Sequence, residues 1–168
     1  MENEFFIHSS SIIDTYGSWR DKSGKNPKIG NGTNIWHFCH ICLGSTIGEN
    51  CTIGQNVYIG PGVVIGDRCR IQNNVSVYDG VKLGNDVFVG PSAVFTNVKF
   101  PEPKVRAEKF DTIVVEDNVM IGANCTIVAP CIIRANTSIG AGAVVTMKEV
   151  PPDAIVYGNP GRVQKWKK

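Results

Sequence analysis

The sequence has almost no excess of charge of either sign, because 17 Lys and Arg residues stand against 15 Asp and Glu residues. Its basic side chains are dispersed apart from a short run at Lys165 to Lys168, so no basic face suited to nucleic acid is evident. It also lacks an apolar run near the ~20 residues of a membrane span, and its first residues are acidic where a signal peptide is basic. We therefore expect a soluble, cytoplasmic protein with no nucleic-acid or membrane partner.

The length is too small for several large domains. At 168 residues with 42% apolar content, the chain is expected to form one domain over residues 1–168. Six cysteines would indicate disulfides only in a secreted protein, and a repeat in the sequence assigns five of them to packing positions.

Aliphatic or aromatic residues recur at every sixth position. The series runs without exception through two blocks, Ile29, Ile35, Ile41, Ile47, Ile53, Ile59, Ile65, Ile71, Val77, Leu83, Val89 and Phe95, then Val115, Ile121, Ile127, Ile133, Ile139 and Val145. Four residues after these positions the chain carries small or β-branched residues, among them Cys39, Cys51, Cys69, Cys125 and Cys131. Three residues after them stand types that tolerate positive φ: Gly32, Gly44, Asn50, Asn56, Gly62, Asn74, Gly80, Asp86, Asn118, Asn124, Asn136 and Gly142.

A six-residue unit of short strand and turn describes one side of a triangular parallel β-helix, with three units in each 18-residue coil. We therefore predict an all-β fold of about six coils. Between the two blocks the chain has two prolines and seven charges, which indicates an external loop. The expected divisions are a leading segment 1–28, coils over 29–97 and 113–150, the external loop 98–112, and a tail 151–168 that packs back on the last coil or on a neighbouring chain.

Some residues are not explained by the scaffold. Trp36, His37, Phe38 and His40 crowd one unit with large side chains where other units carry small ones, so a ligand or partner chain should cover them. Eighteen-residue stacking places Tyr78 under Thr96 and Asp79 under Asn97, beside the external loop. This polar patch is either a substrate site or a solvated polar ladder.

Two small-residue pairs, Gly122–Ala123 and Gly140–Ala141, lie eighteen residues apart on one face. They would leave a shallow channel in which backbone N–H groups can approach a slender ligand. Lys148 and Arg162 are candidates for contacts with phosphate groups.

A zinc site is the alternative interpretation of the cluster at His37, Cys39, His40 and Cys42. Cys39 is phased inward and Cys42 lies beside an inward Ile41, so we expect these side chains not to converge. A zinc site of three histidines that converge between subunits is not expected either, because the third histidine, His8, precedes the predicted coils. The sequence therefore predicts no metal site.

The motifs resemble those of a known family, the left-handed β-helix N-acetyltransferases that act on nucleotide-linked 3-amino-3-deoxy sugars. The resemblance rests on the hexapeptide units and on these strings: Ile35 to Ile41, Gln55 to Val57, Ile71 to Tyr78, Val94 to Val98 and Gly158 to Arg162. It implies left-handed winding, a homotrimer with active sites between subunits, acetyl-CoA as donor, and sugar 3-N-acetylation for surface glycans.

The resemblance also suggests roles for single residues. Asn97 would hold the 3-amino group, and His37 would accept its proton or contact the sugar. The other substrate-binding candidates are Tyr78, Asp79, Asn73, Thr96 and His40. The CoA-binding candidates are Ala123, Ala141, Lys148, Asn159, Pro160 and Arg162, although relatives often carry Ala where this chain has Gly161.

The external loop indicates which sugar the chain acts on within this family. Relatives acting on UDP-linked 3-amino-uronic acids carry an Asn-Pro-Arg element after the Phe-Thr-Asn string, and the stretch Lys99 to Lys104 has no such arginine. The Phe-Pro pair and Phe110-Asp111-Thr112 are more similar to the branch acting on dTDP-3-amino-3,6-dideoxyhexoses. Two other functions remain open. The chain could be a non-catalytic β-helix scaffold, which is a different class of protein. It could also acetylate a 4-amino group, although neither the extra N-terminal domain nor the His–acid pair of such relatives is evident.

Overall fold

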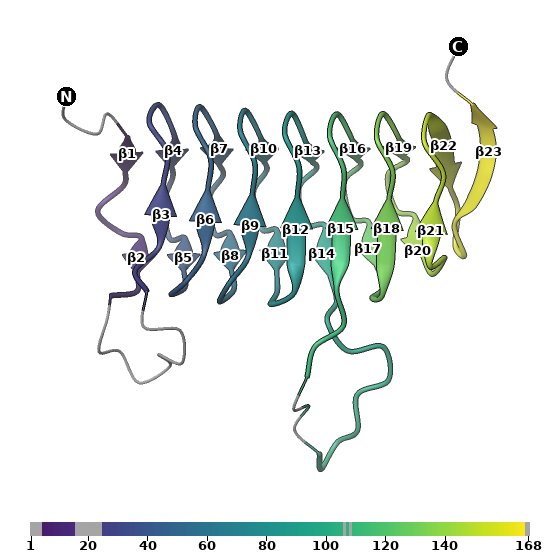
Figure 1. The fold of residues 1–168 in the computed structure, drawn as a ribbon, viewed down its shortest axis with the longest axis horizontal. Coiled ribbons are helices and arrows are strands. Elements are labelled where there is room, and N and C mark those ends of the chain that lie inside the picture. The colour runs from purple at the N-terminus through teal and green to yellow at the C-terminus, as the bar shows by residue number, and fades with distance from the viewer. Residues whose placement is uncertain (1–4, 16–24, 106, 108, 167–168) are drawn as a thin grey trace.

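The computed structural model describes residues 5–15, 25–105, 107 and 109–166, and in these residues every regular element is a β-strand. Three sheets run along the molecule (Figure 1). They enclose one apolar core. The first sheet contains β1 (Phe6–Ile7), β4 (Asn34–Ile35), β7 (Thr52–Ile53), β10 (Arg70–Ile71), β13 (Phe88–Val89), β16 (Met120–Ile121), β19 (Ser138–Ile139), β22 (Ala154–Tyr157) and β23 (Arg162–Trp166).

The other two sheets have seven strands each. The second sheet contains β2 (Ile12–Ile13), β5 (His40–Ile41), β8 (Tyr58–Ile59), β11 (Ser76–Val77), β14 (Val94–Phe95), β17 (Thr126–Ile127) and β20 (Val144–Val145). The third sheet contains β3 (Lys28–Ile29), β6 (Thr46–Ile47), β9 (Val64–Ile65), β12 (Val81–Leu83), β15 (Ile113–Val115), β18 (Cys131–Ile133) and β21 (Glu149–Val150).

The six-residue period determines which side chains form the core. Strands pair in parallel with a step of eighteen residues, as in Ile35 opposite Ile53 and Ile53 opposite Ile71. Seventeen of the eighteen periodic residues are buried, and the first, Ile29, is partly buried against them. All twelve predicted turn residues have positive φ. The predicted all-β parallel solenoid is therefore confirmed.

The coils number about seven rather than six, because strands outside the periodic blocks also join the sheets. In the leading segment, β1 pairs with β4 and β2 pairs with β5. At the other end, β21 pairs with β18 and β22 pairs with β19. The excursion after β2 broke the period, so the sequence pattern could not extend the repeat to β1 and β2; part of it, residues 16–24, lies outside the described residues.

Two irregular segments leave the stack. The chain between β14 and β15 projects from the side of the solenoid (Figure 1), where the external loop was predicted. After β22, the tail turns back as β23 and pairs antiparallel with β22, while the N–H of Gly161 donates to the Val144 carbonyl at 2.7 Å. The tail therefore packs on the last coil. The described residues include no helix long and apolar enough to cross a membrane.

Candidate functional site

The turns between sheets form three corners that run the length of the solenoid. The first corner, between the first and second sheets, contains residues 36–38, 54–56, 72–74, 90–92, 122–124 and 140–142. The second corner, between the second and third sheets, contains residues 42–44, 60–62, 78–80, 96–97, 128–130 and 146–148. The third corner, between the third and first sheets, contains residues 30–32, 48–50, 66–68, 84–86, 116–118 and 134–136.

At the first corner, His37 lies within a group of exposed rings. Its imidazole stacks on that of His8 with 3.5 Å between ring centroids, and Trp36 and Phe38 flank it at 6.3 and 6.1 Å. Trp36 is 43% exposed and Phe38 is 61% exposed. Phe38 also has a φ of 58°, a conformation that costs a bulky residue about 1–2 kcal/mol. The part of the chain that the structure describes thus leaves Trp36 and Phe38 largely uncovered.

A small hollow of about 250 Å³ opens beside His37. Trp36, His37, Thr52, Gly54, Gln55, Gln72 and Asn73 line it. Asn73, a predicted substrate-binding residue, accepts a hydrogen bond at Oδ1 from the Gln55 N–H at 2.9 Å. Asn73 therefore supports the corner structurally as well as lining the hollow.

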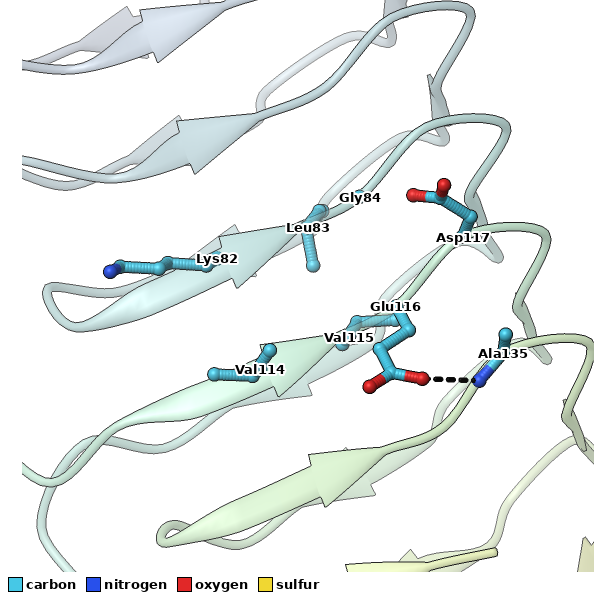
Figure 2. Close-up of a pocket in the computed structure, with 8 residues that line it drawn as sticks. All are labelled: Lys82, Leu83, Gly84, Val114, Val115, Glu116, Asp117 and Ala135. Atoms are coloured by element: carbon cyan, nitrogen blue, oxygen red, sulfur yellow. Dashed lines mark hydrogen bonds between the residues drawn. The ribbon is translucent and has the colours of Figure 1, made fainter. Parts of the chain in front are cut away.

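A larger hollow of about 410 Å³ lies on the third sheet and third corner (Figure 2), where no site residue was predicted. Its wall includes Glu116, which pairs with Arg134 at 2.8 Å and accepts from the Ala135 N–H at 2.9 Å. Both contacts favour the carboxylate, so the pKa of Glu116 lies below its ordinary value. Asp117, the second acid of the wall, accepts from the Asn85 N–H, so both carboxylates of this hollow already have hydrogen-bond partners.

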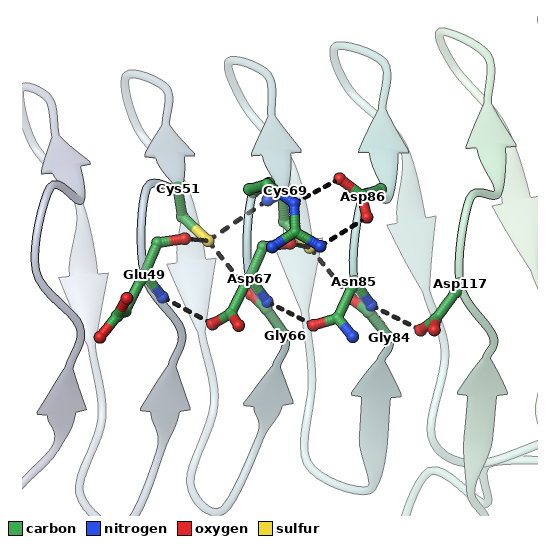
Figure 3. Close-up of polar contacts among 10 residues, drawn as sticks. Glu49, Cys51, Gly66, Asp67, Cys69, Gly84, Asn85, Asp86 and Asp117 are labelled. Carbon is green, nitrogen blue, oxygen red and sulfur yellow. Dashed lines mark hydrogen bonds and ion pairs between the residues drawn. The ribbon is translucent and has the colours of Figure 1, made fainter.

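A ladder of side-chain bonds occupies the backbone N–H groups of the third corner. The N–H of Glu49 donates to Asp67 Oδ1, that of Asp67 to Asn85 Oδ1, and that of Asn85 to Asp117 Oδ1, at 2.7–2.8 Å (Figure 3). Each carboxylate or amide thus satisfies the N–H one coil before it.

At the first corner the described residues show one bond of this kind, from the Gln55 N–H to Asn73, and none at the predicted channel. Because Ala141 stands one coil above Ala123, no side-chain acceptor reaches the Ala123 N–H, and in the described part of the chain neither alanine N–H has a protein acceptor. The backbones are also close, since a Cβ added to Gly122 would lie 2.5 Å from the Ala141 nitrogen. The channel therefore presents two N–H donors beside small residues, with the Tyr157 side chain against Gly140 at its end.

At the second corner, the predicted substrate residues gather at the base of the external loop. The Asn97 carbonyl accepts from the Asp111 N–H at 2.8 Å, which ties the two ends of the loop together. The half-buried Asn97 amide makes no side-chain hydrogen bond within residues 5–15, 25–105, 107 and 109–166. Thr96 Oγ1 accepts from the Ala129 N–H at 3.0 Å. Thr96 thus anchors the next coil, whereas the binding role predicted for Asn97 stays a prediction.

A row of aromatic rings crosses the outer face of the second sheet. The Tyr58 ring lies 5.6 Å from His40 and 5.5 Å from Tyr78. His40 is also paired with Asp14, at 3.1 Å from Nε2 to Oδ1. His40 and Tyr78 are predicted site residues, whereas Tyr58 was not predicted; it occupies an outward strand position eighteen residues from each of His40 and Ser76.

The two candidate catalytic residues do not meet within one chain. His37 lies at the first corner and Asn97 at the second, with the second sheet between them and three coils along the stack. At about 4.8 Å per coil, that offset alone is roughly 14 Å. One amine cannot contact both side chains of the same chain.

The CoA-binding candidates are divided in the same way. The turn with Asn159 and Pro160 follows β22 at the first corner, and the Gly158 carbonyl accepts from the Val144 N–H at 3.0 Å. Arg162 begins β23 next to this turn. Lys148 instead lies beyond the second sheet at the second corner. Gly161 is buried, and a Cβ there would lie 3.2 Å from the Val144 oxygen, so this glycine fits the tail closely on the last coil.

All six cysteines are buried and free. Four thiols donate to backbone carbonyls at 3.0–3.1 Å: Cys39 to Gly54, Cys51 to Gly66, Cys69 to Gly84 and Cys125 to Gly140. Burial raises the pKa of Cys131 to about 11 and raises the pKa of Cys39 and Cys125. The predicted packing role of the five cysteines is confirmed.

Comparison with known proteins identifies relatives of the whole fold. The family described as bacterial transferase hexapeptide (six repeats) matches residues 26–61, 44–78, 62–97 and 112–146. The dTDP-3-amino-3,6-dideoxy-alpha-D-galactopyranose 3-N-acetyltransferase of Aneurinibacillus thermoaerophilus is 42% identical over 159 residues, which cover 95% of this chain and 77% of that protein.

Solved structures agree in fold. PerB from Caulobacter crescentus, in complex with CoA and GDP-perosamine, matches with a TM-score of 0.56 and 18% identity, over 96% of this chain and 57% of that one. The acetyltransferase domain of PglB from Neisseria gonorrhoeae matches with a TM-score of 0.61 and 15% identity, over 96% and 58%. The repeat and the similarity over nearly its full length together place this chain in the bacterial hexapeptide transferase family, as an acetyltransferase.

Proposed function

We propose that the chain transfers the acetyl group of acetyl-CoA to the 3-amino group of a nucleotide-linked 3-amino-3-deoxy sugar, a dTDP-3-amino-3,6-dideoxyhexose, in the cytoplasm for surface glycan biosynthesis. The observation that carries the proposal is the first corner. There the two alanine N–H groups of the small-residue channel have no acceptor within the described residues, and the hollow at His37 opens on the same corner. The name of the 42% identical relative supports the substrate class.

The open N–H groups suit the donor. Pantetheine is a slender chain with amide groups, and its thioester oxygen gains negative charge when a nucleophile attacks. A backbone N–H at Ala123 or Ala141 can donate to these acceptors without displacing a side chain. Asn159, Pro160 and Arg162 stand at the end of the same corner, where Arg162 is exposed and able to meet a phosphate.

The transfer needs a free amine rather than a strong protein base, because amines of this kind titrate not far above neutral pH. The amine nitrogen attacks the thioester carbon, the C–S bond breaks, CoA leaves as a thiolate, and the nitrogen's surplus proton leaves to solvent, to the thiolate or to His37. Asn97 orients the amine by accepting its N–H at Oδ1. Positioning then supplies most of the rate.

The active unit is a homotrimer with the site between subunits. His37 and Asn97 are at least about 14 Å apart in one chain, so a shared amine requires the second corner of one chain to face the first corner of another. The exposed Trp36 and Phe38 are suited to that contact. Light scattering should give a mass near three times 18.2 kDa, and a fully active monomer would exclude a site of this kind.

The test is acetyl-CoA turnover, followed as released thiol, with dTDP- and UDP-linked 3- and 4-amino sugars. Turnover is expected with the dTDP-linked 3-amino-3,6-dideoxyhexose. A preference for a UDP-linked 3-amino-uronic acid would instead assign the chain to the relatives that act on those sugars. No acetyl-CoA binding in calorimetry would favour a non-catalytic scaffold.

A matched pair of variants tests the channel. Ala141→Leu adds bulk beside an N–H without a protein acceptor, whereas Ala135→Leu adds it beside an N–H already bound to Glu116. The first should raise the KM for acetyl-CoA at least tenfold, and the second should leave it unchanged. An equal change in the KM for acetyl-CoA in both variants would show that acetyl-CoA does not bind along the channel.

A further inference from the structure

A compact group of three potential metal ligands lies at the second corner, between β5 and β6. It consists of Asp14, His40 and Cys42, whose ligand atoms all lie within 4.8 Å of one another. His40 Nε2 is 3.1 Å from Asp14 Oδ1 and 3.8 Å from Cys42 Sγ. The sequence analysis rejected a zinc site because His37, Cys39, His40 and Cys42 would not converge. Two of those four do converge, on an aspartate 26 residues upstream of His40.

The distances fit a tetrahedral metal centre. With zinc bonds of about 2.0–2.1 Å to nitrogen, 2.0–2.2 Å to oxygen and 2.3 Å to sulfur, neighbouring ligands should be about 3.4 Å apart for nitrogen–oxygen and about 3.6 Å for nitrogen–sulfur. The nitrogen–oxygen and nitrogen–sulfur distances in the structure, 3.1 and 3.8 Å, differ from these by a few tenths of an ångström. Small side-chain rotations are therefore enough to bind an ion.

The surroundings also suit a bound cation. The Cys42 thiol is buried, and the side chains of Asp14 and His40 are 14% and 34% exposed. A carboxylate this enclosed needs a positive partner or a hydrogen-bond donor. The Cys42 Sγ lies 3.8 Å from the imidazole nitrogen His40 Nε2.

We propose that Asp14, His40 and Cys42 form a binding site for a Zn²⁺-type divalent cation, with water in the fourth position. His40 binds through Nε2 and keeps its proton on Nδ1. Cys42 binds as the thiolate and its proton is released to solvent, so the affinity rises with pH. The site shares His40 with the predicted substrate-binding residues, but binding of the cation does not depend on the function proposed above.

The site would fasten the segment between β2 and β3 to the solenoid. Asp14 directly follows β2, and the segment's far end is already held by the Gly44 N–H, which donates to the Lys25 carbonyl at 2.7 Å. A cation on Asp14, His40 and Cys42 would thus fix the start of the segment beside the point where its end is fixed. The expected effect of the ion is on stability.

The test uses chelator-treated protein titrated with Zn²⁺ and, as a spectroscopic probe, with Co²⁺ alone. One cation per chain should bind, Co²⁺ should produce a thiolate charge-transfer band in the near ultraviolet, and Zn²⁺ should raise Tm. Cys42→Ser should abolish the band, and each of Asp14→Asn and His40→Gln should weaken binding by about 100-fold or more, since even supporting residues of metal sites contribute 10–100-fold.

Cys125→Ser is the matched control, because its thiol is equally buried but donates to the Gly140 carbonyl. This variant should keep both the band and the rise in Tm. The proposal is overturned if Co²⁺ gives no thiolate band with the original chain, or if the band is unchanged in Cys42→Ser. Should Cys42→Ser fail to fold, unchanged Zn²⁺ affinity in the Asp14→Asn and His40→Gln chains would equally reject the site. Acetyl transfer retained without metal leaves the proposed function intact.

Discussion

Replacement of Asn97 by Ala isolates the orienting role of one amide. In the structure this amide is half-buried and has no side-chain hydrogen bond within the described residues, so its removal leaves no orphaned protein partner. We therefore expect the free energy of unfolding to change by no more than about 0.5 kcal/mol, as at an ordinary surface site.

The expected loss of activity follows from the charge on the attacking amine. Its nitrogen becomes positive as the new bond forms, and a hydrogen bond to a charged group contributes about 1.5–3 kcal/mol. At about 1.4 kcal/mol for each factor of ten, kcat/KM should fall by about 10- to 150-fold. Most of the loss should be in kcat, because the interaction strengthens in the transition state.

The assay is a pH profile of kcat/KM for the original chain, Asn97→Ala and His37→Ala. If the substrate amine supplies its own nucleophile, His37→Ala should lose less activity than Asn97→Ala, and its residual rate should still rise with pH as the amine deprotonates. A nearly silent Asn97→Ala, together with a His37→Ala chain that has lost both turnover and pH dependence, would refute the reasoning and identify a histidine general base.

Three further changes test other parts of the structure. In the native protein, thiol reagents should label the inward cysteines only on unfolding: Cys39, Cys51, Cys69, Cys125 and Cys131. Replacing Cys125 by Ala should lower the free energy of unfolding by about 1 kcal/mol without changing turnover. Rapid labelling of the native protein would show that these side chains do not point inward. Phe38→Asn suits a φ of 58° and deletes an exposed ring, so circular dichroism should be preserved while light scattering at low concentration shifts toward monomer; an unchanged trimer would place Phe38 outside the interface. Because the pKa of Glu116 is lowered, its ion pair stabilises the fold above pH 4.5, and this stabilisation is lost as the pH falls through the lowered pKa. In urea unfolding, Glu116→Gln should therefore reduce the fall in the free energy of unfolding at acid pH. An unchanged fall would show that the pair does not contribute.

The repeat was readable from the sequence because each side of a coil imposes the same burial on the same position. Phe38, Arg68 and Ser92 stand in the turn column with positive φ, yet none of them is a type that signals such a conformation. Their places follow from the coils on either side, which fix the backbone regardless of the residue. The repeat's phase therefore predicted backbone geometry better than residue type did.

The site could be predicted only where coils stack at a constant step. The eighteen-residue step correctly aligned Tyr78 with Thr96 and Ala123 with Ala141. It could not place His8 against His37 or Asp14 against His40, because those contacts cross irregular segments whose lengths do not follow the step. The same repeat does imply that His37 and Asn97 lie on different corners, because their separation of 60 residues is three coils and one further unit of six, so the roles that the resemblance suggests for them cannot be combined within one chain.

The antiparallel strand β23 has a consequence for self-association. A parallel solenoid ends in open strand edges, and a second molecule could continue the stack by pairing with them. β23 occupies the outer edge of β22 in the first sheet and presents the exposed charged side chains of Arg162 and Lys165. Charges on a terminal strand discourage further pairing, so growth of end-to-end filaments from this face should be suppressed. Truncation before Arg162 would uncover that edge, and the shortened chain should polymerise at concentrations where the full chain stays dispersed.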